Sequence, residues 1–311
     1  MITIDPIDIR GTMLTSSTVP YPDTGETAWS GASFGYVEGN TVSYLVGSDY
    51  YRFECLVAHT SSATNFPVPK PNETANWLDL GFVNKFAMFQ LDRNTQTIET
   101  TSPLTVGVDP GGRVGAIGLG NLVADSVQLD VYDTFGVNVH TETKDLIDRY
   151  VSSWYSYSYQ PFRQIPATLF SDMPINVDYT FKLTFTKSTG DVKVGSVVCG
   201  MPFDIGDAQY QAKVQRLNFS TFDRAFDGET TITVRRSAPK INLNLFIDKP
   251  DLNGTVKLID DLNGVVTAWA GLVSTTDGYF ESIFIIGLFK DVEYSLDYPN
   301  HAQASIEIEG L

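Results

Sequence analysis

The sequence predicts a mainly β protein with three parts in series: a small β module, a β-sandwich and a C-terminal α+β domain. Two observations lead to this prediction. Apolar and polar residues alternate, as half-buried strands require, in residues 126–133, 178–186, 240–247 and 303–310. Helical patterns are scarce, and the 311 residues, 42% of them apolar, suffice for two or three globular domains.

Residues 1–80 form the predicted first part, which is rich in Tyr, Ser, Thr and Pro. A strand through its tyrosine-rich stretch would send the neighbours Tyr50 and Tyr51 to opposite faces. A module of under about 80 residues buries little core, so every aromatic ring matters to it. Two interpretations follow: the rings build a small core and a contact with another domain, or one or two lie exposed and stack on a ligand.

Residues 81–205 form the predicted second part, where several strand patterns are joined by long connections, as in a sandwich rather than a series of βαβ units. Residues 206–311 form the third part, which begins with a polar segment of weak periodicity. A helix is predicted over 251–264, because Asp251 can cap it and Gly264 can end it. A second, shorter helix is predicted over residues 143–155.

The charge excludes several classes of partner. The chain carries 21 Lys and Arg against 37 Asp and Glu, a net charge of −16, and such a chain repels nucleic-acid backbones and anionic lipid surfaces. No window approaches the ~20 apolar residues that span a bilayer. The N-terminus lacks the basic flank and apolar core of a signal peptide, so we expect synthesis in a cytoplasm as a soluble chain.

Reactive side chains are few and scattered. Cys55 and Cys199 lie in apolar strand-like stretches, which predicts two buried free thiols. His59, His140 and His301 form no pair with the spacing of zinc ligands or of a catalytic site. We therefore expect no enzyme and no cofactor, with one alternative left open: two carboxylates that meet only in space could hydrolyse a polysaccharide.

One turn offers ligands for a cation. Asp92, Asn94 and Thr97 supply oxygen atoms close together in the sequence, and oxygen ligands suit a hard cation such as calcium. The other interpretation is a turn held by Asx hydrogen bonds.

An ordered series of aromatic and glycine residues runs through the first part: Trp29, Tyr36, Gly39, Val42, Tyr44, Gly47, Tyr50, Tyr51, Thr60, Ser61 and Trp77. This series resembles the small carbohydrate-binding modules appended to bacterial chitinases and cellulases. In those modules exposed aromatic rings bind polysaccharide. The resemblance implies Trp29, Tyr36 and Trp77 as carbohydrate-binding residues.

A wider resemblance covers the whole chain and is carried by residues 77–97, 181–200 and 287–311, which look like proteins encoded among the tail genes of bacteriophages. The second part is similar to a galactose-binding-like jelly roll. In that fold a D-x-N-x-x-T turn often abuts a structural calcium, which implies Asp92, Asn94 and Thr97 as its ligands here.

The resemblance implies a structural component of a virion tail, in the distal tail or baseplate, that links the tail core to peripheral or host-contacting parts. Its expected partners are other tail and baseplate proteins and copies of itself in a ring-shaped homo-oligomer. Residues 303–311 are predicted to offer a sheet edge to a neighbour. Two alternatives remain: a receptor-binding lectin that attaches to a host-surface glycan, and a polysaccharide depolymerase.

Overall fold

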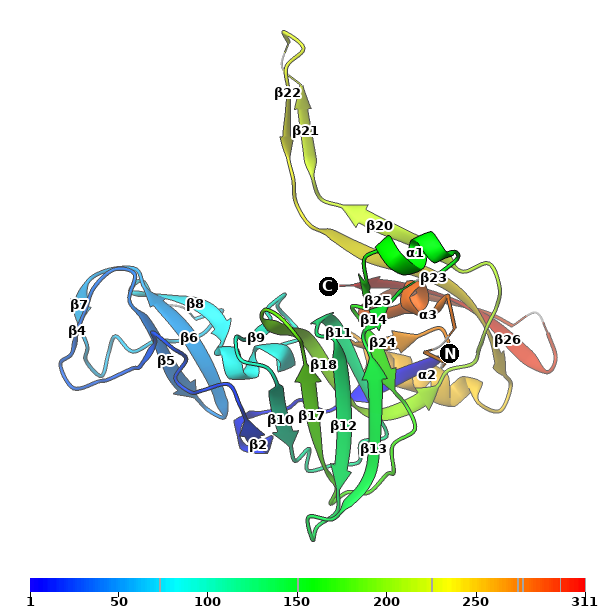
Figure 1. Cartoon of the computed structure of the whole chain (residues 1–311), viewed down its shortest axis with the longest axis horizontal. Coiled ribbons are helices and arrows are strands. Elements are labelled where there is room, and N and C mark those ends of the chain that lie inside the picture. Colours follow the sequence, from blue (N-terminus) through cyan, green and yellow to red (C-terminus); the bar gives the residue numbers. More distant parts are fainter. Residues whose placement is uncertain are drawn as a thin grey trace.

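A computed structural model describes residues 1–72, 74–149, 151–224, 226–272, 274–275, 277–296 and 298–310. The protein is mainly β, as the sequence predicts (Figure 1). Its α-helices within these residues are short: α1 (Trp154–Tyr159), α2 (Leu252–Asp261) and α3 (Phe280–Ile283).

The largest sheet joins the predicted second and third parts. Its strands run in the order β16 (Thr168–Phe170), β11 (Ala116–Val123), β18 (Val192–Asp204), β1 (Ile2–Pro6), β24 (Thr267–Ala270), β25 (Phe284–Ser295), β26 (His301–Gly310), β23 (Ser237–Asp248) and β19 (Asp207–Ala208). Two more strands lie off this path: β20 (Lys213–Asn218) pairs with β23, and β9 (Thr97–Glu99) pairs with β18. The N-terminal strand β1 occupies the middle, because Ile2 pairs with both Asp204 and Ala270.

A five-stranded sheet forms the second layer of the sandwich. Its order is β13 (Asn138–Asp145), β12 (Ser126–Tyr132), β17 (Thr180–Thr186), β10 (Leu104–Val108) and β2 (Leu14–Ser17). The alternation predicted along β12 and β17 is confirmed, since their apolar residues are buried in one core with Ile117, Leu119 and Cys199 of the large sheet.

The small module consists of β3 (Thr27–Ala28), β5 (Thr41–Val46), β6 (Asp49–Cys55) and β8 (Trp77–Phe82) in one sheet, with β4 (Gly35–Tyr36) paired to β7 (His59–Thr60). It stands to one side of the body, at the left of Figure 1. Two 3-10 helices adjoin it, η1 (Gly11–Met13) and η2 (Asn84–Phe89). Strands β1 and β2, which the sequence analysis placed in the first part, pair with strands of the other two parts.

Two predictions for the third part have opposite outcomes. The predicted helix over 251–264 is confirmed as α2, and Gly264 follows it with a φ of 75°, a left-handed conformation that favours glycine. The sheet edge predicted at 303–311 is wrong over the residues that the structure describes, 303–310. Strand β26 is paired on both sides, with β23 and with β25, so its backbone has no free edge to offer a neighbour.

The second predicted helix is wrong over its first residues. Thr143 and its neighbours belong to β13, which pairs with β12, and a short strand, β14 (Ile147–Asp148), follows and pairs with β15 (Arg163–Gln164). Helix α1 begins at Trp154, where the Ser153 side chain accepts a hydrogen bond from the Ser156 backbone N–H.

A hairpin arm leaves the large sheet. Strands β20 and β23 pair from Lys213 to Asn218, and beyond them β21 (Thr221–Arg224) and β22 (Thr230–Thr233) pair only with each other. This arm, residues 219–236, extends away from the body, at the top of Figure 1.

Candidate functional site

Two of the three predicted carbohydrate-binding residues lie in the module core. Tyr36 and Trp77 are 3% and 1% exposed, and their rings meet edge to face with centroids 5.1 Å apart. Stacking on a sugar requires an exposed ring face, which neither side chain has here. Trp29 is half-buried and contacts Tyr44 edge on, with centroids 4.9 Å apart. Carbohydrate binding by Trp29 stays a prediction.

Both tyrosines of the Tyr50–Tyr51 pair are half-buried, on opposite sides of the strand. Tyr50 stacks on Phe86 of η2 with a centroid separation of 5.3 Å. Tyr51 meets Phe82 edge to face at 5.1 Å. Tyr50 therefore joins the module to the core of the body, while Tyr51 packs against the module core, in agreement with the first of the two interpretations.

The three predicted calcium ligands have separate surroundings. Asp92 lines a cleft between the module and the body, whereas Asn94 lines another cleft beneath the arm. The buried Thr97 hydroxyl donates to the Asn84 carbonyl at 2.7 Å and accepts from the Met88 N–H at 3.0 Å. The residues that the structure describes contain no group of three or more His, Cys, Asp or Glu that could hold a metal ion.

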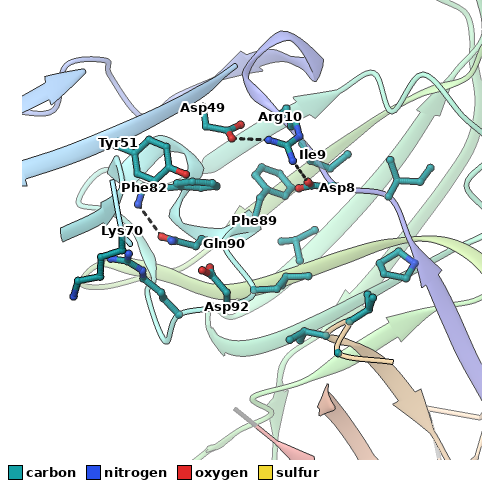
Figure 2. Close-up of a pocket in the computed structure, with 18 of the residues that line it drawn as sticks. Asp8, Ile9, Arg10, Asp49, Tyr51, Lys70, Phe82, Phe89, Gln90 and Asp92 are labelled. Carbon is teal, nitrogen blue, oxygen red and sulfur yellow. Dashed lines mark hydrogen bonds and ion pairs between the residues drawn. The ribbon is translucent and has the colours of Figure 1, made fainter. Parts of the chain in front are cut away.

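The cleft between module and body has a volume of about 650 Å³ and is shown in Figure 2. Arg10 bridges its two sides: one guanidinium nitrogen lies 2.6 Å from a carboxylate oxygen of Asp49 in the module, and the other lies 2.5 Å from Asp8. These two carboxylates, Asp8 foremost, raise the pKa of Arg10. The charges that line this cleft thus fasten the module to the body.

A second ion pair holds the base of the module. The buried Asp79 carboxylate lies 2.6 Å from the Arg93 guanidinium and also accepts backbone hydrogen bonds from Lys70 and Gly81, at 3.0 and 2.7 Å. Burial by itself would raise the pKa of Asp79, but these hydrogen bonds outweigh it and lower that pKa below its ordinary value.

The arm exposes apolar side chains that no part of the chain within the described ranges covers. Phe226, near its tip, is fully exposed, and Phe222 and Val234 are 64% and 82% exposed. Apolar residues gathered on a projecting element indicate a surface for a partner. In the sequence this region is recognisable only as polar and weakly periodic. Its apolar residues are mixed with threonines, and neither face of the arm packs against a core in the described residues.

A second exposed surface, which the sequence analysis missed, is the aromatic segment, residues 151–162. Its exposed apolar side chains are Val151, Trp154, Tyr155, Tyr157, Tyr159 and Phe162. The Arg149 guanidinium lies 5.2 Å from the ring centroids of both Tyr157 and Phe162. The signal was present in the sequence as rings interleaved with serine, a composition found in binding surfaces.

No known family model matches the chain, and no curated protein matches it. None of the helices in the described ranges is both long and apolar enough to cross a membrane.

Proposed function

We propose that the chain is a structural component of a bacteriophage virion tail, in the distal tail or baseplate, where it links the tail core to peripheral or host-contacting parts. The observation that carries this proposal is the arm. Its apolar side chains are uncovered in the single chain, and an isolated two-stranded hairpin is at best marginally stable in water. Another chain must bury it, which is what an assembly protein requires.

The rest of the molecule supports a mechanical role. The module is fastened to the body by two ion pairs, Arg10 with Asp49 and Arg93 with Asp79, so that a force on one part reaches the other. A projecting arm that contacts an identical neighbour head to tail generates a ring when the rotation closes. The proposed partners are thus other copies of the chain and the adjoining tail and baseplate proteins. In this role the chain connects its neighbours and catalyses no reaction.

Purified virions test the location. Antibody against the chain, visualised with gold particles in electron micrographs, is expected to label the distal end of the tail. The purified chain is also expected to co-assemble with other tail proteins of the same virion. Virions that lack the chain altogether would contradict the proposal.

A receptor-binding lectin is the second candidate, and the aromatic segment is the observation that favours it. Exposed rings with neighbouring hydroxyls can stack on sugars and hydrogen-bond to them. If a host-surface glycan binds there, Trp154→Ala and Tyr155→Ala should each abolish the signal on a glycan array. Tyr210→Ala, which removes an exposed ring outside the segment, should leave it unchanged. An array without any response to the unaltered protein would remove this candidate.

A further inference from the structure

We propose that the tip of the arm of one copy binds in an arginine-lined cleft at the base of the arm of a second copy. This inference rests on the proposed function, because it names the contact through which the chain assembles. Two features of the structure, the chemistry of the tip and the chemistry of the cleft, lead to it.

The tip combines apolar side chains with negative charge. Residues 223–229, at the tip, contain three carboxylates, Asp223, Asp227 and Glu229, and a single basic residue, Arg224. Phe226 stands fully exposed among them. The Asp227 carboxylate accepts a hydrogen bond from the Glu229 N–H at 3.0 Å and thereby supports the turn. The tip therefore presents an aromatic ring surrounded by acidic groups.

The arginine cleft has the complementary character. It has a volume of about 630 Å³ and lies between β20, β23, β11 and the segment around α3. Its charged residues are four arginines and one glutamate, namely Arg93, Arg163, Arg216, Arg236 and Glu281. Apolar side chains also line it, among them Pro166, Ala167, Phe284 and Ile286. A ring can rest on the apolar lining while carboxylates meet the arginines.

Two of the four arginines have no acidic partner. Arg93 is paired with Asp79, and Arg163 with Glu281 and Asp148. Arg216 and Arg236, both exposed at the base of the arm, form no ion pair with any residue that the structure describes. Unpaired arginines in a cleft of a chain with net charge −16 favour an acidic occupant.

The occupant is a second copy of the chain. The arm points away from the body in Figure 1, so its tip lies far from the cleft of its own chain. A contact between two different surfaces of identical chains is head to tail and can close into a ring. A neighbouring cavity of about 530 Å³ is less suitable, because its lining has five carboxylates against two basic residues, Lys144 and Arg163. The carboxylates are Glu142, Asp145, Asp148, Asp277 and Glu281. Like charges would repel the tip there.

Cross-linking between two single-cysteine variants tests the contact in the full chain. Both native thiols are buried, so an introduced cysteine is the accessible one. We expect a mixture of Glu229→Cys and Ser282→Cys, the second at the rim of the cleft, to form a disulfide-linked dimer under mild oxidation. Thr143→Cys, in the acidic cavity, is the matched control and should not cross-link to Glu229→Cys.

Charge reversal tests the same contact without oxidation. Arg236→Glu should weaken self-association at least roughly tenfold, and the added change Glu229→Arg should restore it, since a close charge pair across an interface contributes that much. Arg113→Glu, an exposed arginine outside the cleft, should have no effect.

Three outcomes would overturn the inference. In the first, the chain forms oligomers but neither cross-links at this pair nor responds to Arg236→Glu; the contact is then elsewhere, and the proposed function stands. In the second, Arg216 and Arg236 bind an anionic polysaccharide, while oligomers persist when they are reversed. In the third, the chain stays monomeric and does not bind the other tail proteins, which contradicts the proposed function as well.

Discussion

At the scale of single residues, Asp79 is the buried charge on which the attachment of the module depends. Its carboxylate is held by Arg93 and by two backbone N–H groups, and the pKa of Asp79 is lowered as a result. A group with a lowered pKa in the folded state stabilises the fold above its unfolded pKa. That stabilisation is lost as the pH falls through the folded pKa.

We therefore expect Asp79→Asn to lower the free energy of unfolding by about 1–3 kcal/mol at neutral pH, because Arg93 loses its charged partner. The variant should also lose less stability than the unaltered protein as the pH falls below about 4, the ordinary range of an aspartate. Denaturant titrations at several pH values measure both effects. Asp92→Asn, an exposed neighbour, is the control; an equal loss in both variants would argue against the role of Asp79.

Both thiols should be unreactive in the folded protein. Burial raises the pKa of Cys199 to about 12, and it also raises the pKa of Cys55. The thiolate is the reactive form, so a chromogenic thiol reagent at pH 8 should detect no thiol in native protein and two after denaturation. Ser282→Cys provides an exposed thiol for comparison. Rapid labelling of the native, unaltered chain would show that one of the two strands carrying these thiols opens readily.

At the scale of elements, two glycines should respond to alanine in opposite directions. A Cβ at Gly200 of β18 would overlap the carbonyl oxygen of Asp5 in β1, whereas Gly254 in α2 has open space around its Cα. Gly200→Ala should destabilise the protein by about 1–3 kcal/mol. Gly254→Ala should stabilise it by up to about 1 kcal/mol. Thermal unfolding compares the two variants, and equal shifts in one direction would contradict the pairing of β1 with β18.

Local sequence patterns predicted some elements well. The strands β12, β17, β23 and helix α2 are confirmed, because each buries one face and alternation or helical spacing reveals that face. Pairing between distant segments leaves no such local pattern. The central position of β1 and the double pairing of β26 depend on contacts across most of the chain.

At the scale of the whole molecule, the candidate surfaces were the least predictable. Tyr36 and Trp77 matched a sugar-binding pattern, yet a module so small uses those rings as its core. The arm and the aromatic segment expose apolar residues that we propose bind another molecule. Their sequence pattern is therefore not explained by packing within the chain. The cleft likewise gathers Arg93, Arg163 and Arg236 from distant parts of the sequence, so no local pattern reveals it.

Light scattering on the purified chain over a range of concentrations is the most direct test of assembly through the arm. The unaltered chain should form a closed oligomer whose mass is a multiple of 34.3 kDa. A variant with residues 220–235 replaced by an Asn-Gly turn, joining the neighbours Phe219 and Arg236, should fold and remain monomeric. A monomer at every concentration for the unaltered chain, or equal oligomers with and without the arm, would contradict assembly through the arm.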